Sequence, residues 1–139
     1  MIMELSLTRK QFRRLLDMAY IGNWVLNSTR GPDRFSDYDD VQELLFGQAA
    51  REGMTELVEE FRGSYLPSEA YAEGGIHQAI IEYENNMFFE ILAEDLAYRD
   101  MNDVPIDESN YDEYLQRFQD YIGEFEAHGT DNIRIDYVE

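Results

Sequence analysis

The feature that most constrains the fold is a run of apolar residues at helical spacing towards the C-terminal end of the chain. The spacing of three or four residues is kept over four turns by Tyr111, Tyr114, Leu115, Phe118, Tyr121, Ile122 and Phe125. This period predicts an amphipathic helix with one buried stripe, which Ser109 is placed to cap and Gly129 to close. Because other elements must cover such a stripe, we expect a mainly helical fold.

The helical period recurs in four earlier parts of the chain. Residues 9–26 are predicted as a helix, since Thr8 and Gln11 have the spacing of a capping box at its start. Its buried stripe is expected to contain Phe12, Leu15, Leu16, Ala19, Tyr20 and Trp24. Helices are also predicted over residues 38–51, 55–62 and 76–99, the last with a break near Asn85 and Asn86.

The remaining segments are predicted as loops and short strands. Residues 63–75 hold three Gly, a Pro and two Ser, which is typical of a loop, and Ser68 is placed to cap one turn within it. Apolar and polar residues alternate near both ends of the chain, in MIMELSL and in NIRIDYV, as in strands. We therefore expect a mainly α fold in a single compact domain over residues 1–139. It would have five or six helices, and a small β-pairing between the terminal segments is left open.

Composition excludes several classes of protein. The chain has 30 Asp and Glu against 11 Lys and Arg, a net charge of −19, yet its 44% hydrophobic content is too high for a disordered acidic chain. Without Cys, disulfides and thiolate metal sites are excluded. No uncharged run is long enough to cross a bilayer, and the opening residues lack a basic region typical of a signal peptide. We expect a cytoplasmic protein that does not bind membranes.

The charge is unevenly distributed along the chain. Residues 1–34 carry a net +3, largely from a basic strip of Arg9, Lys10, Arg13 and Arg14, whereas residues 35–139 carry −22. A body of −22 repels the phosphate backbone, so direct nucleic-acid binding is not expected. The basic strip is interpreted either as docking on acids of the later helices or as a surface available to a partner.

Catalytic motifs are missing from the sequence. The two histidines each follow a Glu by four residues, in Glu73–His77 and Glu124–His128, a spacing that places both side chains on one side of a helix. Gly74 and Gly75 argue against a helix at the first pair, and the second lies at a helix end where a His is favoured by the dipole. No catalytic residue, metal ligand or cofactor is therefore assigned. An enzyme or a metal-binding helical bundle using His77 or His128 remains an alternative.

Aromatic residues in the predicted loop indicate a binding surface. Tyr65, Leu66 and Tyr71 lie where helix packing does not demand them, and tyrosines in loops commonly anchor protein contacts. The alternative is that they fold back on the core. The favoured function is non-catalytic binding of a protein partner of basic character. Whether the chain forms a homodimer is left open. The rival is a DNA mimic that inhibits a DNA-binding protein or nuclease, since residues 82–139 hold 17 acids and three bases.

The stretch YENNMFFEILAEDLAYRDM, residues 83–101, resembles a segment of small acidic bacterial proteins with no assigned function. The shared features are an acidic turn, an aromatic pair at Phe88 and Phe89, and a helix ending in Arg99 and Asp100. The resemblance implies a bacterial, cytoplasmic protein and assigns no activity or site residue.

Overall fold

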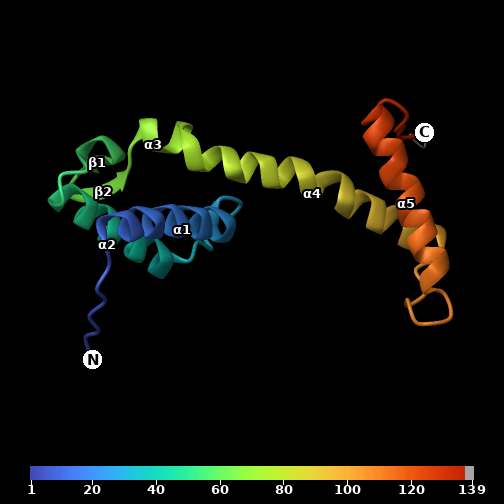
Figure 1. Ribbon diagram of the computed structural model, residues 1–139, viewed down its shortest axis with the longest axis horizontal. Coiled ribbons are helices and arrows are strands. Elements are labelled where there is room, and N and C mark those ends of the chain that lie inside the picture. The colour runs from blue at the N-terminus through green and yellow to red at the C-terminus, as the bar shows by residue number, and fades with distance from the viewer. Residues whose placement is uncertain (137–139) are drawn as a thin grey trace. The chain divides into compact units, whose positions relative to one another are not determined.

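The computed structural model of the protein describes residues 1–136 and is dominated by helices (Figure 1). The longer ones are α1 (Arg9–Asn27), α2 (Ser36–Arg51), α4 (Gly75–Asp100) and α5 (Tyr111–His128). The mainly helical prediction is confirmed. Four long helices and a single turn, α3 (Glu69–Glu73), take the place of the five or six helices expected. Within residues 1–136, no helix combines the length and apolar character needed to cross a bilayer.

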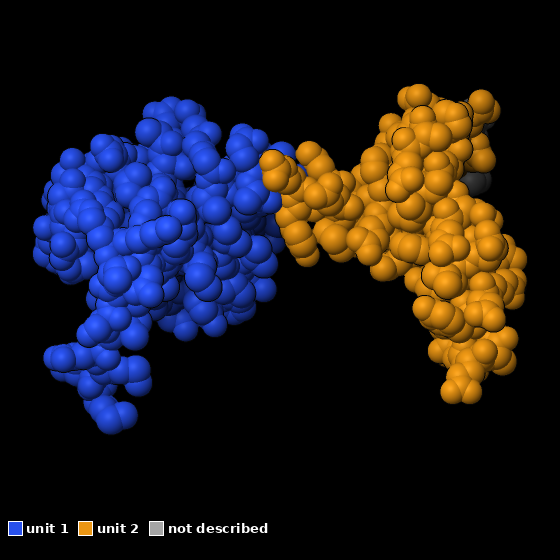
Figure 2. All heavy atoms as spheres, viewed as in Figure 1, with its two compact units in different colours: residues 1–81 blue, residues 82–139 orange. Residues whose placement is uncertain are grey.

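The chain divides into two compact units, Met1–Ile81 and Glu82–Glu139, which are coloured separately in Figure 2. We call them unit 1 and unit 2 and describe each by itself. The expectation of a single domain over residues 1–139 stays a prediction.

In unit 1, helix α1 follows its local sequence closely. Thr8 accepts a hydrogen bond from the backbone N–H of Gln11, and the Gln11 side chain accepts one from the Thr8 backbone, so the predicted capping box is present. Such a cap satisfies two of the N–H groups that a helix start leaves free. The helix therefore begins where the sequence predicts it, at Arg9.

The predicted helix over residues 55–62 is wrong. A single 3-10 turn, η1 (Thr55–Leu57), leads into an antiparallel hairpin of β1 (Val58–Phe61) and β2 (Ser64–Pro67). Phe61 pairs with Ser64, so only two residues connect the strands, and both have positive φ: 52° at Arg62 and 82° at Gly63. Two-residue hairpin turns require such angles, and Arg is an uncommon residue there, which is why the turn is hard to read from the sequence.

The predicted loop over residues 63–75 is also largely structured. It contributes strand β2 and then helix α3, whose first turn Ser68 caps by accepting a hydrogen bond from the N–H of Tyr71. Together with the start of α4, these segments cover one side of α1 and α2. The core of unit 1 that results contains Leu16, Tyr20, Phe46, Ala49, Met54, Tyr71 and Ile80.

Helix α1 also buries polar side chains that the apolar pattern did not indicate. Asp17 and Asn23 are each 7% exposed and Asn27 is 1% exposed. Trp24, by contrast, was expected in the buried stripe and is 37% exposed. The buried side of α1 therefore includes the polar residues Asp17, Asn23 and Asn27 and leaves Trp24 partly exposed.

Unit 2 consists of the second part of α4, the connector and α5. Helix α4 continues through Asn85 and Asn86 without the predicted break. Ala93 and Ala97 are fully buried, and the Phe89 and Phe125 rings stack with centroids 5.0 Å apart. The predicted last helix is confirmed and ends at Gly129, whose φ is 57°, but no side chain caps its start, so the predicted Ser109 cap is wrong.

The expected β-pairing of the terminal segments is absent from the described residues. Neither residues 1–7 nor residues 130–136 contain a strand, and the small sheet is the β1–β2 hairpin. Tyr137 and Val138, which complete the alternating C-terminal pattern, lie outside the described residues.

Candidate functional site

Unit 2 carries a hollow between its two helices. Its volume is about 440 Å³, and four of its eight lining residues are apolar, namely Phe89 of α4 with Phe118, Ile122 and Phe125 of α5, which we call its floor. The complete lining is Asn85, Asn86, Phe89, Glu90, Phe118, Ile122, Phe125 and Glu126, which we call the α4–α5 hollow. Two helices can cover each other along one stripe only, so the flanks of this contact stay open to solvent.

Exposed apolar side chains extend the floor of the hollow. The Phe88 ring meets that of Phe89 edge to face, with centroids 4.9 Å apart, and Phe88 is 53% exposed. Tyr83 and Ile91 on the same helix are also exposed. A helix that is apolar on several sides normally has neighbours on those sides, so this part of α4 offers a surface for another molecule.

Acidic groups dominate the surroundings of the hollow. Unit 2 holds 17 Asp and Glu against three Arg, a net of −14. Two of the three Arg are engaged inside the unit, Arg99 with Asp100 at 2.8 Å and Arg117 with Glu113 at 2.9 Å. Glu90 and Glu126 in the lining itself therefore stand in a strongly negative field.

A polar cluster fixes α5 against the end of α4. The Tyr121 hydroxyl donates to Oδ2 of Asp100, and the Arg99 guanidinium donates to Oδ1 of the same carboxylate at 2.8 Å. The hydrogen bond from Tyr121, with that from Arg99, lowers the pKa of Asp100. The same contact raises the pKa of Tyr121, so the hydroxyl remains a donor at neutral pH.

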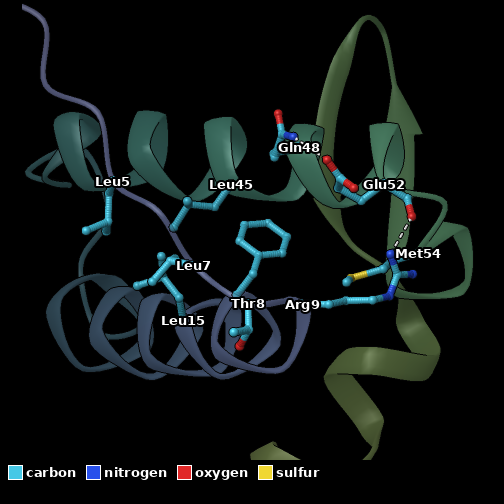
Figure 3. Close-up of a pocket in the computed structure, with 10 residues that line it drawn as sticks. Leu5, Leu7, Thr8, Arg9, Leu15, Leu45, Gln48, Glu52 and Met54 are labelled. Atoms are coloured by element: carbon cyan, nitrogen blue, oxygen red, sulfur yellow. Dashed lines mark hydrogen bonds between the residues drawn. The ribbon is translucent and has the colours of Figure 1, made fainter.

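Unit 1 has a groove of its own, of about 410 Å³, where the N-terminal segment passes over α1 and α2 (Figure 3). Leu5 and Leu7 of this segment face Leu15 of α1 and Leu45 of α2 in the groove. At one end Arg9 donates to the backbone carbonyl of Glu52 at 3.0 Å. The leucines make one part of the groove apolar, and its other end is polar, where Gln48 also donates to the Glu52 carboxylate at 2.9 Å.

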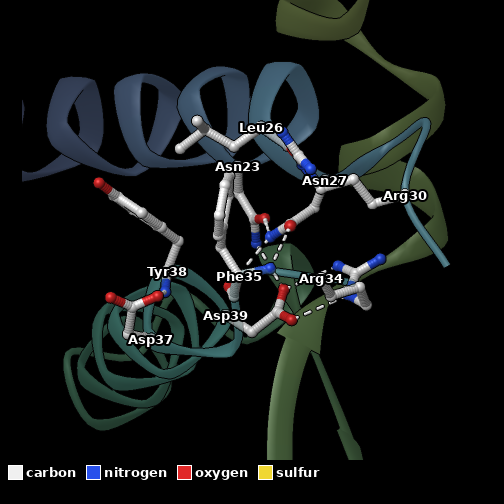
Figure 4. A network of polar contacts seen from close by, with 9 residues as sticks. All are labelled: Asn23, Leu26, Asn27, Arg30, Arg34, Phe35, Asp37, Tyr38 and Asp39. Atoms are coloured by element: carbon white, nitrogen blue, oxygen red, sulfur yellow. Dashed lines mark hydrogen bonds and ion pairs between the residues drawn. The ribbon is translucent and has the colours of Figure 1, made fainter. Parts of the chain in front are cut away.

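The turn between α1 and α2 is held by a network of polar groups, of which Asn23 and Asn27 are buried (Figure 4). The Asn27 side chain accepts from the N–H of Phe35 at 2.8 Å and donates to the carbonyl of Phe35 at 3.2 Å. Asn23 donates to Asp39 at 3.0 Å, and Arg34 donates to both oxygens of Asp39. The Arg34 hydrogen bond, helped by that of Asn23, lowers the pKa of Asp39. This network is structural, since all its members bind one another.

The three residues predicted for partner binding do not form one surface. Tyr71 is 5% exposed and its hydroxyl donates to Asp17 at 2.8 Å, so its predicted place on a binding surface is wrong. Burial, together with the Asp17 contact, raises its pKa. Tyr65 is half-buried against Gly47, while Leu66 is 41% exposed on β2. The physical reason is that β2 and α3 fold back over α1 and α2, the alternative weighed for this segment.

The arginines of the basic strip contact residues that lie close to them in unit 1. Arg13 and Arg14 both approach Asp17 of the same helix, at 2.5 and 3.7 Å, and Arg9 binds the backbone of Glu52. Lys10 and Arg14 remain exposed. The ion pairs of the strip within residues 1–136 are therefore local and do not reach acids of the later helices.

The two histidines lie in different settings. Nδ1 of His77 is 2.9 Å from the Tyr20 hydroxyl, and its ring packs edge-on against Trp24 at 4.7 Å between centroids. His128 pairs with Glu124 at 2.9 Å near the end of α5. In the part of the chain that the structure describes, no three side chains of His, Cys, Asp or Glu are grouped as a metal site would require. Neither histidine has the surroundings of a metal ligand.

Comparison with known proteins adds no assignment. No protein-family model, no curated protein and no solved structure matches this chain. The resemblance of residues 83–101 to small acidic bacterial proteins stays a prediction.

Proposed function

We propose that this protein is a non-catalytic binding domain and that the α4–α5 hollow of unit 2 binds a basic protein segment. The observation that carries the proposal is an open apolar floor within a unit of net charge −14. Apolar contacts supply most of the free energy of protein association, and charge selects the partner.

The apolar part of the site supplies anchor positions. Phe88 is exposed beside the hollow, and Phe89, Phe118 and Ile122 line it. A single large side chain inserted among such rings contributes about 1.5–3 kcal/mol from burial. Aromatic side chains that surround one deep position are typical of the energetically dominant centre of an interface.

The charge of unit 2 specifies the occupant. An acidic segment would meet repulsion from Glu90, Glu126 and the other carboxylates, whereas a segment with Lys or Arg flanking an apolar anchor would be attracted. The partner is therefore an amphipathic basic segment, in which apolar residues at helical spacing enter the hollow. Attraction between opposite charges weakens as salt screens it, so binding should depend on ionic strength.

A peptide of Leu and Lys, with Leu at positions i, i+3, i+4 and i+7 and Lys between them, tests this proposal, with polylysine as the charge-only probe. We expect the full-length protein to bind the Leu–Lys peptide more tightly than polylysine, and both more weakly at about 300 mM than at about 50 mM NaCl. The substitution Phe88→Ser should weaken Leu–Lys binding by about tenfold, which corresponds to about 1.4 kcal/mol.

The matched control is Val104→Ser, which removes an apolar residue of similar exposure from the connector of the same unit, whereas Phe88 packs against Phe89 of the lining. This variant should bind the peptide as the unmodified protein does. Equal affinity for the two probes, with no effect of Phe88→Ser, would show attraction to acidic charge alone and would refute the binding site.

A further inference from the structure

The pair of helices α1 and α2 has one covered side and one open side. Leu16 and Phe46 are fully buried under β2, α3 and the start of α4. Residues two positions away point in nearly the opposite direction on a helix, and there Met18 and Leu44 are 69% and 67% exposed. Val25 and Val41 continue the two exposed rows at 68% and 53%. We call the open face the surface formed by Gln11, Arg14, Leu15, Met18, Val25, Val41, Leu44 and Leu45.

The N-terminal segment adds to this apolar surface. Leu5 and Leu7 line the groove towards Leu45 and a second hollow towards Met18, so the segment lies across one end of the open face. Leu5 itself is 76% exposed. A contiguous apolar area with this extent on a small domain marks an interface.

Charged residues stand at the two ends of the open face with opposite signs. Helices α1 and α2 run antiparallel, because Arg9 binds the carbonyl of Glu52 at one end and Asn27 binds the backbone of Phe35 at the other. Lys10 and Arg14 therefore lie at one end, on the first turns of α1. Asp37 and Asp40 lie at the other end, on the first turns of α2.

We propose that the open face binds a second copy of this chain as a two-fold symmetric dimer. A two-fold axis that lies in the plane of the contact and is perpendicular to the helices brings the basic end of one copy against the acidic end of the other, and does so twice. The same arrangement packs Met18, Val41 and Leu44 of both copies together and removes them from water.

The charges that border the open face balance one another. Two bases, Lys10 and Arg14, stand at one end and two acids, Asp37 and Asp40, at the other. At physiological salt, charges more than about 8 Å apart are largely screened. Self-association through this face is thus governed by its local balance.

Sedimentation velocity of the full-length protein tests the proposal, with no peptide or other partner present. We expect a dimer at micromolar concentration. The paired reversals Lys10→Glu with Arg14→Glu should weaken self-association by about tenfold or more, and so should Asp37→Arg with Asp40→Arg. The control Glu59→Arg with Glu60→Arg makes the same charge change as the Asp37 and Asp40 pair, but on β1, outside the open face. It should leave the dimer intact.

Mixing the two reversed variants is the decisive measurement, because recovery of dimers in the mixture shows that both variants are folded and that only the charges at the contact had prevented self-association. In a mixed dimer the acidic first turn of α1 in one copy meets the basic first turn of α2 in the other, and the second contact is unchanged. We expect the mixture to recover dimers that neither variant forms alone. A monomeric unmodified protein, or a mixture that stays monomeric, would overturn the proposal, whereas the peptide binding of unit 2 is measured separately.

Discussion

Buried polar side chains determine how the two helices of unit 1 are joined. The Asn27 side chain supplies hydrogen-bond partners to the backbone N–H and carbonyl of Phe35. Asn23 and Arg34 both donate to the Asp39 carboxylate. Buried polar groups are tolerated only when they are hydrogen-bonded, and no buried side-chain oxygen or nitrogen in residues 1–136 lacks a partner. The network therefore sets the geometry of the turn between α1 and α2, and with it the open face.

The lowered pKa of Asp39 gives this network a pH dependence. Because the folded-state pKa lies below that of an unfolded Asp, about 3.9, the stabilisation is complete above that value. It is lost as the pH falls through the lowered folded-state pKa. We expect Asp39→Asn to reduce the free energy of unfolding at pH 7 by about 0.5–1 kcal/mol, a small value because the ion pair is partly exposed.

Urea denaturation of both proteins at pH 7 and at about pH 2.5 measures this difference. The gap between unmodified protein and Asp39→Asn should narrow at the acidic value, because the pH there is below the unfolded-state pKa. Glu43→Gln removes a carboxylate from the same helix, outside the acidic end of the open face and without touching Arg34, and serves as control. A gap that is the same at both pH values would contradict the role of the Asp39 charge.

The burial of polar side chains in unit 1 could not be predicted from the sequence. Asp17 becomes a core residue because Tyr71, 54 positions later, supplies a hydroxyl and Arg13 a guanidinium. Such partners are brought together by tertiary structure, whereas an apolar pattern assigns Asp and Asn to the surface. The same contact explains why Tyr71, predicted on a binding surface, is buried.

At the scale of elements, local signals predicted helix ends well and strands poorly. The start of α1 was predicted because the capping box of Thr8 and Gln11 is contained in four neighbouring residues. Asn85 and Asn86 indicated a break in α4, but a residue's weak preference for caps does not outweigh continuous backbone hydrogen bonding. The β1–β2 hairpin depends on a turn with Arg62 at positive φ, a position that favours Gly or Asn.

Glycines with different backbone angles give opposite predictions for the same substitution. Gly123 lies inside α5 with nothing within 4 Å of the position a Cβ would take, so Gly123→Ala should stabilise the protein by about 0.5–1 kcal/mol. Gly63 has a φ of +82° in the hairpin turn, and Gly63→Ala should destabilise it by about 1 kcal/mol. Thermal unfolding followed by circular dichroism should show shifts of opposite sign. Shifts of equal sign would contradict the backbone assignment of these two residues.

At the scale of the whole molecule, charge follows the division into two units. The sequence already indicated that residues 82–139 hold 17 acids and three bases, and these are the residues of unit 2. Unit 1 carries eight bases against 13 acids. Composition can be counted along the chain without a structure, but the α4–α5 hollow and the open face depend on which helix sides are covered. The sequence therefore predicted the charge of the candidate surfaces but not where these surfaces lie.

The concentration of acid in unit 2 predicts a salt-dependent stability that differs between the units. Carboxylates at a net −14 repel one another in the folded state, and salt screens this repulsion. The sole tryptophan, Trp24, lies in unit 1, so its fluorescence reports on that unit, whereas circular dichroism reports on helices of both. Urea is uncharged and leaves the ionic strength free to vary.

We expect the urea midpoint seen by circular dichroism to lie below that of Trp24 fluorescence at about 20 mM NaCl, since the helices of unit 2 are the more destabilised. Raising the salt to about 500 mM should increase the circular dichroism midpoint by about 0.5 M urea, or about 1 kcal/mol at a typical m value. The fluorescence midpoint should move less, because unit 1 has eight bases against 13 acids whereas unit 2 has three against 17. Coincident midpoints that shift together at every salt concentration would mean that the repulsion in unit 2 is shared by the whole molecule as one cooperative structure.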